Sequence, residues 1–151
     1  MACPVEWRIK LKSLILAVLG FFFLSFQFPK DHGFHKESQL EWCYFVGEVV
    51  SDQGRKFGYE LSFFRAKISE ATELYPVHFA ISDLDQNKHH TSQSISRSQL
   101  GIVSWKDGKL VSGDYQFTSI SPTRFSIHAK PRDSSGLALN LELRSERPIL
   151  S

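Results

Sequence analysis

The chain has 151 residues, of which 42% are hydrophobic and 23% are charged, so it is long enough for one domain with a sizeable core. Its formal net charge is +2, and without residues 1–27 the chain holds 15 Lys and Arg against 15 Asp and Glu. Nucleic-acid partners require a basic surface that neutralises phosphates, so this balance sets that partner class aside.

The N-terminal segment has the layout of a secretory signal. Arg8, Lys10 and Lys12 precede the charge-free run Leu14–Phe26. As a helix this run would span about 20 Å, which is short of the roughly 30 Å hydrocarbon core of a bilayer. The sequence therefore predicts a hydrophobic export helix within residues 1–27, either cleaved as a signal peptide or kept as a signal anchor. In the second case residues 14–26 tether the protein to a membrane. The rest of the chain is expected in the periplasm, the envelope or outside the cell.

The chain has two cysteines, Cys3 and Cys43. Because Cys3 lies in the N-terminal segment, no disulfide framework is expected in the rest of the chain. A Cys-x-x-Cys pair is absent from the sequence, so a thiolate zinc site is not expected either. Cys43 is expected to pack as a small apolar residue.

Beyond residue 40, runs of alternating apolar and polar residues are separated by turn signals, which predicts antiparallel strands. Asp52-Gln53-Gly54 and Asp107-Gly108 are hairpin turns of this kind. About eight strands joined by hairpins predict an all-β antiparallel meander that closes into a barrel or a sandwich. The predicted strands are Glu41–Ser51, Lys56–Ser69, Val77–Leu84, Ile102–Trp105, Tyr115–Ile120, Arg124–Lys130 and Leu137–Ser145, with a weaker pattern over residues 89–98.

Two details complete this prediction. Ser69–Leu74 is compatible with a short helical turn, followed by Tyr75-Pro76 ahead of the third strand. In the last strand every second residue from Leu137 to Leu143 is a leucine, and we expect these four side chains to cover the core.

Aromatic residues dominate the first two strands. Trp42, Tyr44, Val46 and Val50 share one face of the first strand, and Phe57, Tyr59, Leu61 and Phe63 share one face of the second. An eight-stranded barrel either fills its interior with such side chains or encloses one small ligand. The pattern is compatible with a filled barrel and with a barrel that encloses a ligand. In a barrel that encloses a ligand, an apolar, elongated molecule would suit these side chains.

Polar residues give weaker signals. The histidines His32, His35, His78, His89 and His90 follow no metal-ligand spacing, so structural roles are favoured and no metal or cofactor is expected. No Gly-x-Ser-x-Gly elbow is present. Asp83 and Asp85 flank Leu84, and their side chains point the same way. Either the two carboxyl groups are buried and one of them has a raised pKa, or both lie in a solvated turn.

Four motifs, in this order and spacing, give the chain a resemblance to a known family. It resembles the AttH-type, carotenoid 1,2-hydratase-like proteins, which are secreted lipocalin-like proteins often described as predicted hydrolases. The motifs are FPKDHGFH (Phe28–His35), EWCYFVGEV (Glu41–Val49), QGRKFGYELSFFR (Gln53–Arg65) and VHFAISD (Val77–Asp83).

The resemblance implies two lipocalin-like β-barrels in tandem with a pocket for a ligand or substrate. Residues 28–151 resemble the N-terminal part of the family, so we expect the first barrel in a chain that is truncated relative to the family. Members usually read Glu-Trp-Trp-Tyr where this chain has Cys43 in place of the second Trp. Because strand neighbours face opposite sides, this change leaves the face of Trp42 and Tyr44 intact.

Positions that match the family's motifs supply the candidate site. They are Asp31, His32, Gly33, His35, Glu41, Trp42, Tyr44, Gly47, Gly58, Tyr59, Phe64, Arg65, His78 and Asp83. The acid–base candidates among them are Asp31, His32, Glu41, Tyr44 and Asp83. The ligand-binding candidates are Trp42, Tyr59, Phe64, Arg65 and His78.

Two functions stay open at this point. The first is an exported lipocalin-like domain that binds an apolar or isoprenoid-like small molecule. The alternative is a hydratase or hydrolase for a lipid-like or carotenoid substrate, or an inactive N-terminal fragment of such an enzyme. A hydratase needs an acid that protonates an alkene. We expect Asp31, His32 and Glu41 to cluster with Tyr44 at the barrel opening, as a functional site or as a structural plug.

Overall fold

The structure is a computed structural model that describes residues 34–35, 37–97, 103–133 and 136–146. All of these belong to one compact unit, Phe28–Pro148. The predicted export helix and the candidates Asp31 and His32 lie outside the described residues. Among the described residues there is no helix that is long and apolar enough to cross a membrane.

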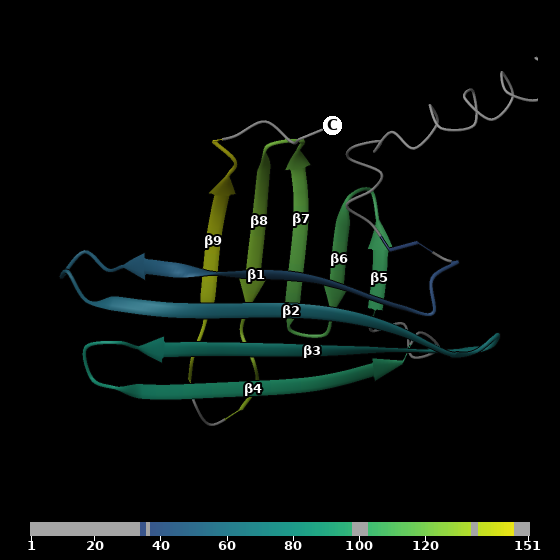
Figure 1. Cartoon of the computed structure of the whole chain (residues 1–151), viewed down its shortest axis with the longest axis horizontal. Coiled ribbons are helices and arrows are strands. Elements are labelled where there is room, and N and C mark those ends of the chain that lie inside the picture. Colours follow the sequence, from purple (N-terminus) through teal and green to yellow (C-terminus); the bar gives the residue numbers. More distant parts are fainter. Residues whose placement is uncertain (1–33, 36, 98–102, 134–135, 147–151) are drawn as a thin grey trace, which may run out of the picture. The chain divides into compact units, whose positions relative to one another are not determined.

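Nine antiparallel strands form the described part of the chain, in two separate sheets (Figure 1). The first sheet has the order β1-β2-β3-β4 and the second the order β5-β6-β7-β8-β9, so within each sheet every strand pairs with its neighbours in sequence. The strands are β1 (Leu40–Val50), β2 (Lys56–Ser69), β3 (Thr72–Asp83), β4 (Lys88–Arg97), β5 (Val103–Lys106), β6 (Lys109–Ser112), β7 (Tyr115–Ser121), β8 (Arg124–Ala129) and β9 (Leu139–Arg144).

The all-β antiparallel prediction is confirmed, and so are its main turns. Gly54 has a φ of 79°, while Asp107 and Gly108 have φ of 52° and 74°. Two consecutive residues in the left-handed region are what a tight hairpin turn requires, which is why an Asp-Gly pair joins β5 to β6. The four-residue strand β6, which follows this turn, was absent from the predicted set.

The helical turn that the sequence allowed at Ser69–Leu74 does not form. A two-residue turn at Glu70 and Ala71 joins β2 directly to β3, which runs through Pro76. Pro76 has no N–H to donate, and the β2–β3 ladder has a gap between the pairs Phe63–Val77 and Ala66–Leu74. Pro76 still lies opposite Ile95 of β4, so the strand continues past the proline.

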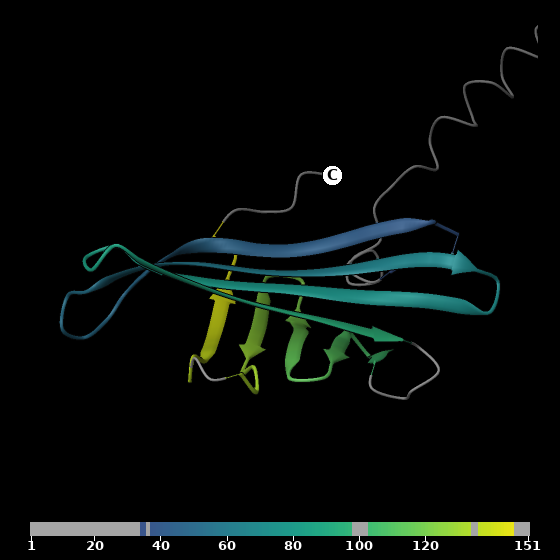
Figure 2. The ribbon, with the colours of Figure 1, turned by 90° about the horizontal axis from the view of Figure 1, so that it is seen from below.

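The two sheets pack face to face, and the strands of the second cross those of the first (Figures 1 and 2). Phe45 of β1 contacts Phe117 of β7 with ring centroids 5.0 Å apart, and the Phe79 and Tyr115 rings meet at 6.3 Å. The Tyr115 hydroxyl donates to Ser92 Oγ at 3.1 Å, which adds one polar tie between the sheets. The core side chains are Tyr59, Leu61, Phe63, Val77, Phe79, Leu110, Tyr115, Phe117, Ile127, Ala129 and Leu139.

The leucine face of the last strand is confirmed, since Leu137, Leu139, Leu141 and Leu143 all pack on this core. The expected lipocalin-like barrel stays a prediction. In the described part of the chain the hydrogen-bonded strands form a four-stranded and a five-stranded sheet. Each sheet therefore presents one face to the shared core and one outer face.

Candidate functional site

Arg65 of β2 is the centre of a polar cluster at one end of the first sheet. Its side chain is 4% exposed, and its guanidinium donates to both backbone and carboxylate oxygens. Nη1 reaches the carbonyl oxygens of His35 and Ser38 at 3.0 and 2.9 Å and Glu41 Oε2 at 3.3 Å. Nε and Nη2 reach Glu73 Oε1 at 3.1 and 2.5 Å. A buried guanidinium is tolerated only with such pairing, so these groups depend on one another.

Glu41 binds the segment before β1 to this cluster. Its two carboxylate oxygens accept the backbone N–H of His35 at 2.8 and 2.7 Å, and Oε1 also lies 2.7 Å from His35 Nδ1. Together with Arg65, these partners surround the carboxylate with an amide, an imidazole and a guanidinium. Glu41 therefore serves as an anchor for His35 ahead of β1.

Glu73 and Tyr75 of β3 complete the cluster, and neither was among the site residues predicted from the sequence. The Tyr75 hydroxyl donates to Glu73 Oε2 at 2.6 Å. The hydrogen bonds from Arg65 and Tyr75 hold the pKa of the Glu73 carboxyl below its usual range, against a smaller opposite effect of burial. Burial and the bond to Glu73 raise the pKa of Tyr75 to about 12. Glu73 is therefore a stable anion and Tyr75 a stable donor at neutral pH.

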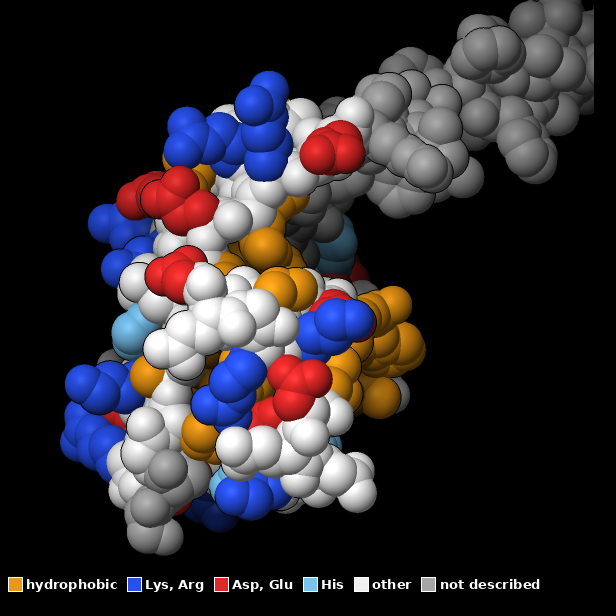
Figure 3. Space-filling model, turned by 90° about the vertical axis from the view of Figure 1, so that its left-hand side faces the viewer, with side chains coloured by type: hydrophobic (Ala, Val, Ile, Leu, Met, Phe, Trp, Pro, Cys, Tyr) orange, Lys and Arg blue, Asp and Glu red, His pale blue; other side chains and the backbone are white. Residues whose placement is uncertain are grey.

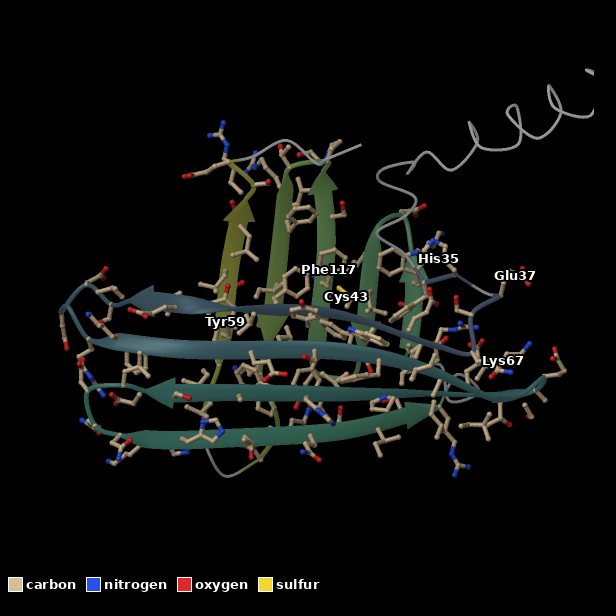
Figure 4. The ribbon with its side chains drawn as sticks, viewed as in Figure 1. His35, Glu37, Cys43, Tyr59, Lys67 and Phe117 are labelled. Atoms are coloured by element: carbon tan, nitrogen blue, oxygen red, sulfur yellow. The ribbon has the colours of Figure 1, made fainter. Side chains whose placement is uncertain are left out.

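A chain of aromatic rings links this cluster to the core. The Phe34 ring lies 6.1 Å from that of Tyr75 and 6.3 Å from that of Trp105, which stacks on Phe117 at 6.1 Å. Cys43 lies beside Phe117 between the sheets (Figure 4). The space enclosed by these side chains and Leu110 measures about 10 Å³, close to the minimum for a single water molecule. This part of the interior is filled.

Burial raises the pKa of the Cys43 thiol to about 11, so the thiol is protonated at neutral pH. Nucleophilic cysteines have depressed pKa values and lie in electropositive surroundings. Cys43 has a raised pKa and apolar neighbours. It packs among apolar rings, as the sequence predicts.

Asp83 lies at the opposite end of the first sheet. It pairs with Arg55 and accepts the backbone N–H groups of Asp85 and Gln86 at 3.2 and 3.0 Å. Burial acts to raise the pKa of Asp83, but the Gln86 amide and the Arg55 guanidinium outweigh it and lower the pKa. The raised carboxyl pKa that the sequence allowed for Asp83 is therefore wrong, because the turn supplies donors. Asp83 is a buried turn acceptor.

These positions separate the acid–base candidates. Glu41 lies opposite Arg65 of β2, whereas Asp83 lies opposite Phe57, eight residues away on the same strand. At about 3.3 Å per residue the two carboxylates are about 26 Å apart along the sheet. Tyr44 lies on the outer face of β1 and Glu41 on the inner face. The structure does not bring Glu41, Tyr44 and Asp83 together.

The ligand-binding candidates divide between the two faces. Tyr59 and Arg65 point inward and are buried at 9% and 3% exposure. Gly47 leaves room for Tyr59, because a Cβ there would approach the Tyr59 ring to 3.1 Å. Burial also raises the pKa of the Tyr59 hydroxyl. Both residues are part of the interior of the domain.

Trp42, Phe64 and His78 lie on the outer face of the first sheet. Trp42 pairs with Phe64 across β1 and β2, and the Phe64 ring contacts the His78 ring at 5.1 Å. Figure 3 shows hydrophobic side chains gathered on this side of the molecule. We call the exposed side chains of Leu40, Trp42, Tyr44 and Val46 the β1 stripe. The sequence placed Trp42, Tyr44 and Val46 on one face, and the structure turns that face to solvent.

A metal centre finds no support in the described residues, where no three His, Cys, Asp or Glu side chains converge. A family model described as AttH-like matches residues 24–151. The chain belongs to the AttH-like family. The resemblance inferred from the four sequence motifs is therefore confirmed.

A solved structure supports the fold of this AttH-like chain. The crystal structure of a protein described as an AttH from Nitrosomonas europaea superposes with a TM-score of 0.70 at 24% sequence identity. The match covers 82% of this chain and 39% of that one, so the chain spans well under half the length of this relative. No protein with a curated description matches the chain.

Proposed function

We propose that this AttH-like domain binds an apolar small molecule on the outer face of its first sheet. The β1 stripe carries the proposal: Leu40, Trp42, Tyr44 and Val46 are 57%, 59%, 60% and 66% exposed. Isolated exposed apolar side chains are ordinary on protein surfaces, but contiguous ones mark binding sites because their hydration is unfavourable.

The apolar surface continues across the sheet. Phe64 lies opposite Trp42, and the register of β2 and β3 places Pro76 beside Phe64. Ile95 of β4, 71% exposed, lies opposite Pro76. The stripe therefore joins an apolar row that crosses all four strands, which provides a platform for a flat or elongated molecule.

A hollow of about 220 Å³ adjoins Val46 at one end of the stripe. It forms where Gly58 has no side chain and Ala80 has a short one. Glu60 and the Ser82–His89 pair, whose Oγ and Nδ1 are 2.8 Å apart, supply polar groups there. The arrangement suits an elongated molecule with an apolar body along the stripe and a small polar end in the hollow.

The alternative of a hydratase or hydrolase has less support. A hydratase needs a carboxyl or another acid that gives up a proton to its substrate. Asp83 is held as an anion by Arg55 and turn amides, and Glu41 is bound by Arg65 and His35. The described acid–base candidates are also about 26 Å apart or on opposite faces. These residues support structural roles better than catalysis.

One observation favours a second candidate function. The Nitrosomonas relative has more than half of its chain outside the matched part, so an additional polypeptide could cover the outer face. In that case the β1 stripe would be a docking surface for another domain. This reading predicts self-association of the isolated chain through the stripe and no affinity for small apolar molecules.

The test uses the full chain and the neutral fluorescent probe Nile red, with geranylgeraniol as the competitor. The proposal predicts saturable probe binding that geranylgeraniol displaces. Trp42→Ser is expected to weaken binding by about 2–3 kcal/mol, since roughly half of an indole surface would lose its contact. Ile120→Ser, which removes a 48% exposed apolar side chain from the second sheet, is the matched control.

Two results would contradict the ligand proposal. Equal weakening by Trp42→Ser and Ile120→Ser would mean that the probe binds without preference for the stripe. A chain that dimerises, loses the dimer on Trp42→Ser and takes up no probe would favour the docking function.

Export of the chain is a further part of the proposal, supported by the basic residues ahead of Leu14–Phe26. Replacing Leu16 and Leu19 with Arg is expected to retain the protein in the cytoplasm, because charges destroy the apolar run. Cell fractionation measures the result, and unchanged export of the double variant would refute it.

A further inference from the structure

The outer face of the second sheet carries a hollow of about 510 Å³, within the usual size range of small-molecule pockets. It lies where the turn between β6 and β7 meets the end of β8. Figure 3 shows Lys and Arg side chains along this side of the molecule, opposite the hydrophobic side chains of the first sheet. The side chains that matter for its chemistry are Asp114, Gln116, His128, Lys130 and Arg132.

The main chain fixes the walls of this hollow. Gly113 turns the chain with a φ of 58°, a conformation that other residues rarely adopt. The backbone N–H of Lys130 donates to the carbonyl of Asp114 at 3.2 Å and holds the end of β8 against the turn. Pro131 is buried beside this contact. The hollow therefore exists without a ligand, which reduces the ordering cost of binding.

The charges around the hollow are mainly positive. Arg132 Nε donates to Asp114 Oδ1 at 2.9 Å, so the only acid among the lining residues is already engaged. In the part of the chain that the structure describes, neither the Lys130 ammonium nor the His128 ring forms an ion pair. The carboxamide of Gln116 is oriented by its bond to Thr118 Oγ1 at 3.2 Å. Lys130 and the Nη groups of Arg132 thus remain available as donors to an anion.

We propose that this hollow binds a small anion with a carboxylate or phosphate group, held by Lys130 and Arg132. Guanidinium and ammonium groups form short, charge-assisted hydrogen bonds to such oxygens. The volume leaves room for an organic body beyond the anionic group. This site is on the opposite side of the domain from the β1 stripe and does not depend on the apolar ligand proposed there.

The test titrates inorganic phosphate and, separately, succinate into the full chain and follows binding by calorimetry. Saturable binding is expected, and Lys130→Gln and Arg132→Gln should each weaken it about tenfold by removing one charge-assisted donor. Lys88→Gln, which removes an exposed lysine from the first sheet, is the matched control and should have no effect. Tighter binding of phosphate or of succinate decides between the two anion classes.

A further variant separates a site from unspecific attraction. Asp114→Asn removes the competing carboxylate beside Arg132, so anion binding should become tighter, and damage to the fold would not produce that result. Absence of saturable binding by both probes overturns the proposal. So does equal weakening by Lys88→Gln and Lys130→Gln, or binding that Asp114→Asn leaves unchanged or weakens.

Discussion

The two ends of the first sheet each hold an arginine against carboxylates, but the surroundings differ. At one end the Arg65 side chain is 4% exposed and bridges Glu41, Glu73 and two backbone carbonyls. At the other end the Arg55 side chain is 41% exposed and meets a single carboxylate, that of Asp83, which turn amides also hold. One cluster is part of the packed interior, and the other closes a turn.

This difference decides what each ion pair does for the fold. Arg55 is partly exposed, and the turn amides still hold Asp83 without it, so loss of this pair changes the free energy of unfolding less. Loss of the buried Arg65 leaves the carboxylates of Glu41 and Glu73 without the cation that pairs with both of them. The Arg65 cluster therefore ties the segment before β1 to three strands, whereas the Asp83 contacts set the geometry of the β3–β4 turn.

The largest expected effect is that of Arg65→Met. It leaves Glu41 and Glu73 without their cation, and breaking a buried pair in this way costs about 3–5 kcal/mol. Arg55→Met, the matched substitution at the other end, is expected to cost less because Asp83 keeps the backbone N–H groups of Asp85 and Gln86 as donors. Urea unfolding of both variants measures the comparison. Equal losses would mean that the turn amides do not compensate Asp83 for the missing cation.

A medium effect is expected from Tyr75→Phe, which removes only the hydroxyl that donates to Glu73 at 2.6 Å. A hydrogen bond to a charged group contributes about 1.5–3 kcal/mol, and the loss should lie at the lower end of this range because Glu73 keeps Arg65. Tyr44→Phe is the control, since Tyr44 is 60% exposed on the outer face. A control loss as large as that of Tyr75→Phe would contradict the assignment.

The sequence predicted the turn end of the sheet better than the buried end. Turn residues act locally, so Gly54 was sufficient to place the β1–β2 hairpin at this end, as Asp107-Gly108 was for the β5–β6 hairpin of the second sheet. Glu73 and Tyr75 reach Arg65 only through the register of β2 and β3, and that register depends on the two-residue turn at Glu70 and Ala71. A helical turn at Ser69–Leu74 would have placed both residues elsewhere.

Alternation in β1 predicted which residues share a face but not which face is buried. Trp42, Tyr44 and Val46 lie outside, while Cys43 and Phe45 lie inside against Phe117. Both faces of this strand are apolar, so periodicity alone gives no preference. The decision comes from the second sheet, whose aromatic side chains meet Phe45 and Phe34. For the same reason only part of the candidate ligand surface could be predicted.

The smallest expected effect concerns pH and applies to both ends of the sheet. The pKa of Glu73 is lowered in the folded chain, so its ionised form stabilises the fold above the unfolded value of about 4.3. That contribution is lost as the pH falls through the folded pKa. In urea unfolding between about pH 6 and pH 3, the destabilisation by Glu73→Gln should therefore shrink with falling pH. Asp83→Asn should show the same sign, because the pKa of Asp83 is lowered too.

Combining Glu73→Gln with Tyr75→Phe sharpens the test. The Tyr75 hydroxyl then has no anion to bind, so the second substitution should add less than it does alone. A Glu73→Gln loss that stays constant over the whole range would mean that the carboxylate gains nothing from Arg65 and Tyr75, and that the cluster does not act as a unit.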